Sequence, residues 1–171
     1  MAHIQRTSPA NAPYAAHTMR YRASPALEAF ILSRAPEHYP TPYAPNSLAE
    51  LERYRYAFAL PVSGEHSART IYSSTEVNYA FRAWHDRLHI ELNAEFDADG
   101  ELAVARAHEQ AVRDAIKQGQ LTELDCCALF FEVWGQFRYA QEHGGSFPTD
   151  QSAFVAACFS EGMSAAILRD F

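Results

Sequence analysis

Three histidines and one glutamate lie in a single segment of the chain at the spacing of a metal site. His85 and His89 stand four residues apart, so on a helix they point within about 40° of each other and share a face. Glu101 and His108 stand seven residues apart, about 20° short of two full turns, and also share a face. Imidazole and carboxylate groups are ligands that divalent transition ions take from proteins, often four at a time. The segment therefore predicts a metal site made of His85, His89, Glu101 and His108.

Two consecutive helices must position these four side chains. The apolar pattern predicts one helix over residues 76–93 and a second over residues 101–118, joined by a turn at residues 97–100. Helices joined by a short turn are commonly antiparallel neighbours, which brings their polar faces together. We therefore expect residues 76–143, which include the next helix as well, to carry the metal site.

An alternative interpretation is that these histidines are ordinary polar surface residues. The chain contains eight histidines, and that many produce some helical pairs by chance. The adjacency of the two helices favours the metal site, because chance pairs have no reason to fall on neighbouring helices.

The segment HDRLH, residues 85–89, has the spacing of the zinc peptidase signature HExxH, with Asp86 in place of the glutamate. In that signature the acidic residue polarises the attacking water. Aspartate is one methylene shorter, and the sequence shows no edge strand that could hold an extended peptide, so a peptidase is the weaker hypothesis. Asp86 could also orient a ligand imidazole by a hydrogen bond, or form an exposed ion pair with Arg82 or Arg87.

A further carboxylate comes from the helix that follows. Glu132 lies in LFFEVWGQF, among apolar and aromatic residues. A carboxylate in such surroundings is costly to bury unless it meets a cation, a metal or several donors. We expect Glu132 to be a general base or a fifth ligand, with an outward-pointing side chain as the alternative. Gln136 is one turn on from Glu132, and Gly135 beside it predicts a close backbone approach.

The whole pattern predicts an all-α fold, a compact bundle of five or six helices in a single domain over residues 1–171. Residues 1–24 are rich in proline and tyrosine and lack a helical period, so we expect an irregular N-terminal arm. The segment 37–46 contains three prolines and predicts a structured loop. The predicted helices cover residues 25–35, 47–60, 76–93, 101–118, 122–143 and 150–170, the last with a bend at Gly162.

Composition limits the partners and the compartment. The net charge is −7, with 14 basic and 21 acidic residues, so a nucleic-acid partner is not expected. No apolar run reaches the roughly 18 to 20 residues of a membrane span. The three cysteines have no CxxC spacing, and with no apolar signal segment at the start we expect a cytoplasmic protein with reduced thiols.

The region from residue 79 to residue 150 resembles a group of poorly characterised bacteriophage proteins with the pattern HD…H…GE…H…E..GQ. This chain departs from the group between the first two histidines, where the others have one more residue and a glycine. The resemblance implies a phage origin, the host cell's cytoplasm and a polar site, and no known reaction. The residues that match the pattern are Arg82, His85, Asp86, His89, Phe96, Gly100, Glu101, His108, Glu132, Gly135 and Gln136.

These features favour a metal-dependent hydrolase that acts on a small polar or nucleotide-like substrate. The cofactor would be a divalent transition metal, with zinc favoured and iron or manganese as alternatives. Asp86 or Glu132 would accept the proton of a metal-activated water. Iron would instead suit an oxygen-dependent reaction. A non-catalytic accessory protein that binds a host protein, or a second copy of itself, is the competing hypothesis.

Overall fold

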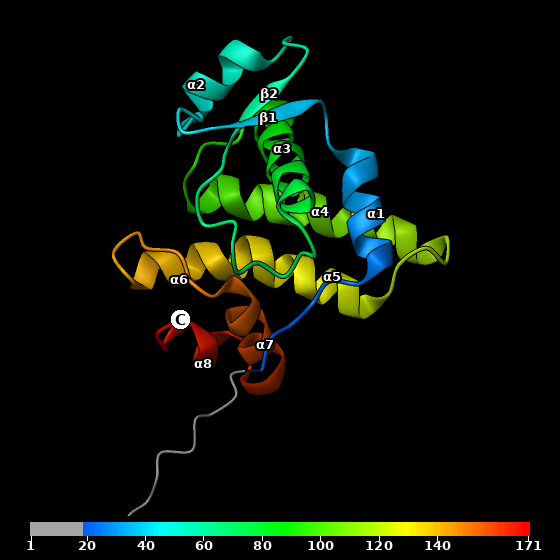
Figure 1. Cartoon of the computed structure of the whole chain (residues 1–171), viewed down its shortest axis with the longest axis vertical. Coiled ribbons are helices and arrows are strands. Elements are labelled where there is room, and N and C mark those ends of the chain that lie inside the picture. Colours follow the sequence, from blue (N-terminus) through cyan, green and yellow to red (C-terminus); the bar gives the residue numbers. More distant parts are fainter. Residues whose placement is uncertain (1–18) are drawn as a thin grey trace, which may run out of the picture.

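Helices dominate the fold, which a computed structural model describes for residues 19–171 (Figure 1). Strands β1 (His38–Thr41) and β2 (Leu60–Ser63) form a small parallel sheet. A 3-10 turn, η1 (Glu52–Tyr54), and a π-helical segment, η2 (Phe131–Gly135), adjoin α-helices. The α-helices are α1 (Pro25–Arg34), α2 (Leu48–Leu51), α3 (Thr75–Leu92), α4 (Ala98–Lys117), α5 (Glu123–Phe130), α6 (Gln136–Glu142), α7 (Gln151–Glu161) and α8 (Met163–Ile167).

The predicted arm lies outside the described residues except for residues 19–24. This last part is extended and joins two distant segments: the amide of Tyr21 donates to the Ser152 carbonyl at 3.0 Å, and the amide of Ala23 donates to the Ile71 carbonyl at 2.9 Å. It therefore ties α7 to the segment before α3.

The two strands correct the prediction of a purely helical fold. The segment 37–46 was predicted to be a loop, but β1 lies within it and pairs with β2, with His38 opposite Leu60 and Thr41 opposite Ser63. Four paired residues are too few to show a period of two in the sequence. Both strands are edge strands. Their prolines, which have no backbone N–H, are tolerated there because each strand has a partner on one side only.

The helix predicted over residues 47–60 is also wrong in its length. Ser47 caps α2 as the sequence indicated, but the regular helix ends at Leu51 and one 3-10 turn follows. Leu51 and Leu60 instead pack with Ile90 of α3 in a small separate core. Tertiary burial of Leu60 in β2 thus overrides the local helical pattern.

Helices α3 and α4 confirm the predicted pair that should carry the metal site. Ser74 caps α3, and Asn93 ends it in the left-handed conformation, with φ 51°. Asp97 then caps α4 by accepting a hydrogen bond from the Gly100 amide at 2.9 Å. In Figure 1, α3 lies between the two strands above it and α4 below it, and it contacts both.

The run from α5 through η2 to α6 replaces the single helix predicted over residues 122–143. It lies below α4 in Figure 1 and contacts it. A Cβ on Gly135 would lie 3.3 Å from the Phe154 ring, which confirms the predicted close approach. Gly162, with φ 88°, separates α7 from α8 as the predicted bend.

The main hydrophobic core lies where α1, α3, α4, α5, η2 and α7 meet, and it includes Leu27, Trp84, Val112, Leu129 and Phe154. Within residues 19–171, no helix combines the length and the apolar character needed to cross a bilayer.

Candidate metal centre

His85, His89 and Glu101 bring their ligand atoms together between α3 and the first turn of α4. The two Nε2 atoms lie 3.0 Å apart, and Glu101 oxygens lie 3.6 Å from Nε2 of His85 and 3.5 Å from Nε2 of His89. Ligands about 2.0 to 2.1 Å from a tetrahedral ion are about 3.3 Å from one another. The three separations therefore bracket the spacing that one such ion requires.

His89 is oriented by the turn that joins the two helices. Its ring is completely buried, and its Nδ1 lies 2.9 Å from the carbonyl oxygen of Ala94. Because a carbonyl only accepts, Nδ1 carries a proton, and Nε2 is the ring atom left to face His85 and Glu101 and to bind an ion. A backbone carbonyl that fixes the tautomer in this way is a common outer partner of metal-bound histidine.

The charges of the cluster suit a cation. Burial lowers the pKa of His85 to about 3, so this imidazole is neutral, as a ligand must be. Burial also opposes ionisation of His89 and Glu101, but the interaction between them prevails: the pKa of His89 is raised and that of Glu101 is lowered. Without an ion, a proton shared by these groups balances the carboxylate, and a bound cation would displace it.

His108, the fourth predicted ligand, lies beside the cluster and not within it. Its ring stacks on His85 with centroids 5.6 Å apart and meets Trp84 edge-on at 4.1 Å. The group of ligand atoms within 4.8 Å of one another comprises only His85, His89 and Glu101. Both ring nitrogens of His108 are buried without a hydrogen-bond partner among the described residues. The ring would have to move to bind the same ion.

Replacing His108 by Phe is expected to stabilise the metal-free protein, prepared with a chelator, by about 1 kcal/mol. A buried polar group without a partner costs about that much. The same change should lower zinc affinity by about 10-fold, since His108 packs on a ligand ring. Urea unfolding and zinc titration measure the two effects.

His143→Phe is the matched control for this change. His143 lies 2.8 Å from the Ile167 carbonyl through Nε2, so its replacement removes a satisfied hydrogen bond and should destabilise the fold without affecting zinc. A less stable His108→Phe protein that binds zinc normally would contradict the account.

Asp86 lines a cavity next to His85. Burial raises its pKa to about 7, a value suited to proton transfer near neutral pH. Among the described residues, Asp86 forms no ion pair with Arg82 or Arg87, which was the predicted alternative. Arg82 donates to the carbonyls of Ser63 and Glu65, each at 2.7 Å, and Arg87 donates to a backbone carbonyl at 2.9 Å.

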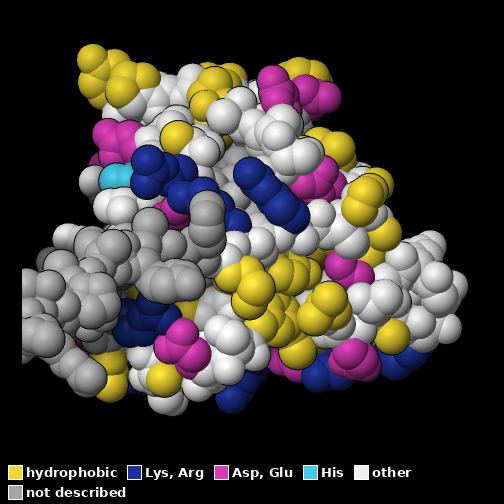
Figure 2. Space-filling view, turned by 60° about the horizontal axis from the view of Figure 1, so that its bottom comes forward, with side chains coloured by type: hydrophobic (Ala, Val, Ile, Leu, Met, Phe, Trp, Pro, Cys, Tyr) yellow, Lys and Arg dark blue, Asp and Glu magenta, His cyan; other side chains and the backbone are white. Residues whose placement is uncertain are grey.

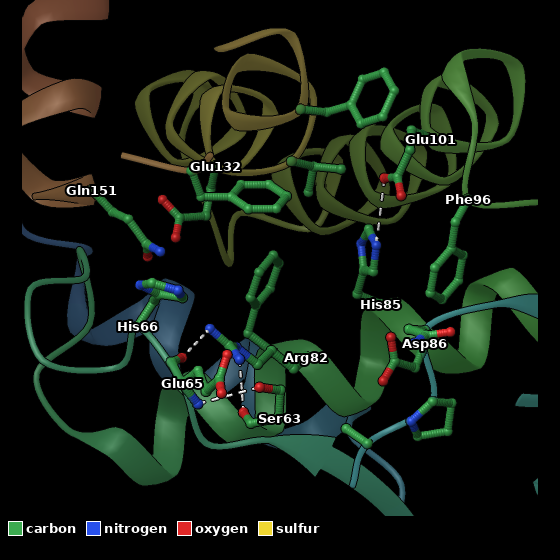
Figure 3. A pocket seen from close by; sticks show the side chains of 17 residues that line it. Ser63, Glu65, His66, Arg82, His85, Asp86, Phe96, Glu101, Glu132 and Gln151 are labelled. Carbon is green, nitrogen blue, oxygen red and sulfur yellow. Dashed lines mark hydrogen bonds and ion pairs between the residues drawn. The ribbon is translucent and has the colours of Figure 1, made fainter. Parts of the chain in front are cut away.

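The cavity has a volume of about 440 Å³, within the usual range for small-molecule sites. One side carries His85, Asp86 and Glu101, and Figure 3 shows Arg82 and Glu132 facing the same space. Loops and other helices complete the wall with Ala44, Pro45, Asn46, Ser63, Glu65, His66, Phe81, Phe96, Val133, Phe137, Phe147 and Gln151.

Sequence reasoning missed most of this wall. His66 is exposed but also lines the cavity, and Ser63 is the last residue of β2. No local signal marks these positions, because only the tertiary fold brings their separate segments to the site.

Glu132 is buried, at 5% exposure, and lines the cavity, so the outward-pointing alternative is wrong. It does not belong to the ligand cluster. Burial raises its pKa to about 8, against the opposing effects of Gln136 and Arg82. The side chain is therefore a neutral acid at neutral pH.

Glu132→Gln is expected to make the free energy of unfolding of the metal-free protein fall less as the pH rises. A carboxyl whose pKa rises from 4.5 to about 8 on folding contributes stability that is complete below about pH 4.5 and lost as the pH rises to about 8. Glutamine does not titrate. The free energy of unfolding in urea should fall less for the variant than for the wild type between about pH 5 and about pH 8.5; equal losses would show that Glu132 is ionised in the native protein.

One face of the molecule bears on possible macromolecular partners. Figure 2 shows several basic side chains close together across the middle of this face, with acidic and hydrophobic side chains around them.

No protein-family model, curated protein or solved structure matches this chain.

Proposed function

We propose that the protein is a metal-dependent hydrolase whose ion is held by His85, His89 and Glu101 and whose small polar substrate occupies the adjoining cavity. The observation that carries the proposal is the convergence of three ligand atoms, 3.0 to 3.6 Å apart, on one side of that cavity. Zinc is the favoured ion, because two histidines and a glutamate form one of its known catalytic ligand sets.

A bound divalent ion would lower the pKa of a coordinated water to near neutrality. The chain's own residues supply the rest. His89, fixed by the Ala94 carbonyl, and Glu101, fixed in the capped first turn of α4, would hold the ion. Asp86, the neighbour of His85 on the cavity wall, would accept a proton from a water activated there.

Iron is the second candidate ion, favoured by the same three side chains. Two histidines and one carboxylate also form the facial triad of non-haem iron enzymes, which activate oxygen at the open positions. The reaction would then be an oxidation and not a hydrolysis. Anaerobic loading with Fe²⁺ followed by oxygen uptake separates the two chemistries.

Activity of the chelated and reloaded protein tests the hydrolase. Purified protein is treated with a chelator, reloaded with one equivalent of Zn²⁺, Mn²⁺ or Fe²⁺, and incubated with nitrophenyl esters, nitrophenyl phosphates and short amides. We expect hydrolysis that requires the ion and is lost in His85→Ala.

Asp86→Asn separates binding of the ion from catalysis. The variant should bind zinc with wild-type affinity and hydrolyse the substrate at least about 100-fold more slowly, the usual scale of a general base. A protein that takes up no transition metal, and whose stability is indifferent to chelators, would instead favour the non-catalytic binding protein.

A further inference from the structure

Glu132 lines the cavity and has a polar atom without a partner among the described residues. Its Oε2 is buried and has no hydrogen-bond partner among residues 19–171. In the view of Figure 3, Glu132 lies on the side of the cavity that carries Gln151 and His66, and His85 and Glu101 lie on the other side. An unpartnered buried carboxyl oxygen is costly, so its retention beside an open space indicates a ligand group that completes it.

The backbone beneath Glu132 is irregular. Residues 131–135 form a π-helical segment between α5 and α6, and Glu132 and Val133 of this segment both line the cavity. π-Helical turns are rare and occur frequently at functional sites. The segment re-aims two side chains that a continuous α-helix would place differently.

The rest of the wall is suited to a flat ring. Phenylalanines from four different parts of the chain line the cavity: Phe81, Phe96, Phe137 and Phe147. Aromatic faces and edges bind planar rings by stacking and edge-to-face contact. The cavity thus combines apolar ring surfaces with the carboxyl group of Glu132.

We propose that Glu132 is the specificity-determining residue of this cavity and binds the amide-like edge of a planar ring, where a hydrogen-bond donor and an acceptor stand side by side. The class includes lactam and aminopyrimidine rings as well as simple aromatic amides. This inference rests on the proposed function in treating the cavity as a substrate site, but the contact itself needs no metal.

The chemistry of a neutral acid supports this class of ligand. With its pKa raised to about 8, Glu132 presents an O–H donor beside a carbonyl acceptor, which matches a donor and acceptor pair on the ligand. Two such hydrogen bonds fix the orientation of a planar ring. Arg82 donates two of its five N–H groups to backbone carbonyls, which anchors its guanidinium to residues 63–65.

Tyr72 offers the competing structural explanation. Its hydroxyl is also buried without a partner, and Glu132 is among the groups that raise its pKa. If Glu132 served only Tyr72, its replacement would affect stability and leave ligand binding unchanged. Tyr72 does not line the cavity, so Tyr72→Phe should leave ligand affinity within about threefold of the wild-type value.

Three probes of the same shape test the proposal: benzamide, the benzamidinium cation and benzoate. Their dissociation constants are measured by ligand-observed NMR at about pH 6.5 with the metal-free wild type and with the metal-free variants Glu132→Gln, Glu132→Leu and Tyr72→Phe. We expect Glu132→Leu to weaken benzamide at least about 10-fold, the effect of one lost hydrogen bond of about 1.4 kcal/mol. Glu132→Gln keeps a donor and an acceptor, as the neutral acid has, so the affinities of all three probes should stay within about threefold of the wild-type values.

Benzoate and benzamidinium are the control ligands: benzoate offers only acceptors and benzamidinium only donors, so each should bind the wild type at least about 10-fold more weakly than benzamide. Equal benzamide affinity in wild type and Glu132→Leu, or no saturable benzamide binding to the wild type, would overturn the proposal. If Glu132→Leu fails to fold, the wild-type preference for benzamide over benzamidinium and benzoate decides. Repeating the titrations with one equivalent of zinc keeps this result separate from that of the metal centre, because probe affinity is read with and without the ion.

Discussion

Glu101→Gln is expected to lower zinc affinity by more than about 100-fold and to abolish metal-dependent activity. The change keeps the shape of the side chain but removes the negative charge that balances the ion. Loss of an outer partner of a metal ligand costs about 10- to 100-fold in affinity, and Glu101 is in direct reach of both histidines. Zinc titration against a competing chelator measures the effect.

Glu91→Gln is the matched control for this prediction. Glu91 is exposed on α3, so the same chemical change should leave zinc affinity within about twofold of the wild-type value, as surface substitutions usually do. A Glu101→Gln protein that folds normally and still binds zinc at wild-type affinity would remove Glu101 from the site.

Gly100→Ala is expected to destabilise the protein by about 3 kcal/mol or more. A Cβ at Gly100 would lie 1.9 Å from the carbonyl oxygen of Glu95 and 2.8 Å from its amide nitrogen. Both atoms belong to the backbone, so the turn between α3 and α4 would have to move, which places the change among the severe substitutions. Because Ala94 and Glu101 flank this turn, zinc affinity should fall as well.

Gly64→Ala provides the comparison. A Cβ there would meet nothing closer than the Tyr79 hydroxyl at 3.8 Å, an ordinary contact, and the free energy of unfolding should change by less than about 1 kcal/mol. Similar stabilities of the two variants in urea would mean that the turn at Gly100 is looser than described.

Much of the candidate site was predictable because it depends on local spacing. The four-residue step from His85 to His89 and the capped turn before Glu101 are features of helix geometry, and both appear in the structure as predicted. His108 lies near the same face as predicted, but its packing against Trp84 and His85 decides where its nitrogens point. Helical periodicity carries no information on that packing.

The rest of the fold depended on contacts between distant segments. The pairing of His38–Thr41 with Leu60–Ser63 joins two stretches whose local patterns predict a loop and a helix. The π-helical turn at Phe131–Gly135 had no sequence signature apart from Gly135, and it decides that Glu132 faces the cavity. Periodicity alone therefore could not place Ser63, His66 or Glu132 on the wall of the cavity.

The most direct measurement is the location of zinc in crystals of the protein loaded with one equivalent, from anomalous diffraction on both sides of the zinc absorption edge. The account predicts a single strong peak about 2.0 to 2.2 Å from Nε2 of His85, Nε2 of His89 and a carboxylate oxygen of Glu101. A zinc peak elsewhere on the molecule, or no peak while these three side chains stay bonded to one another, would contradict it.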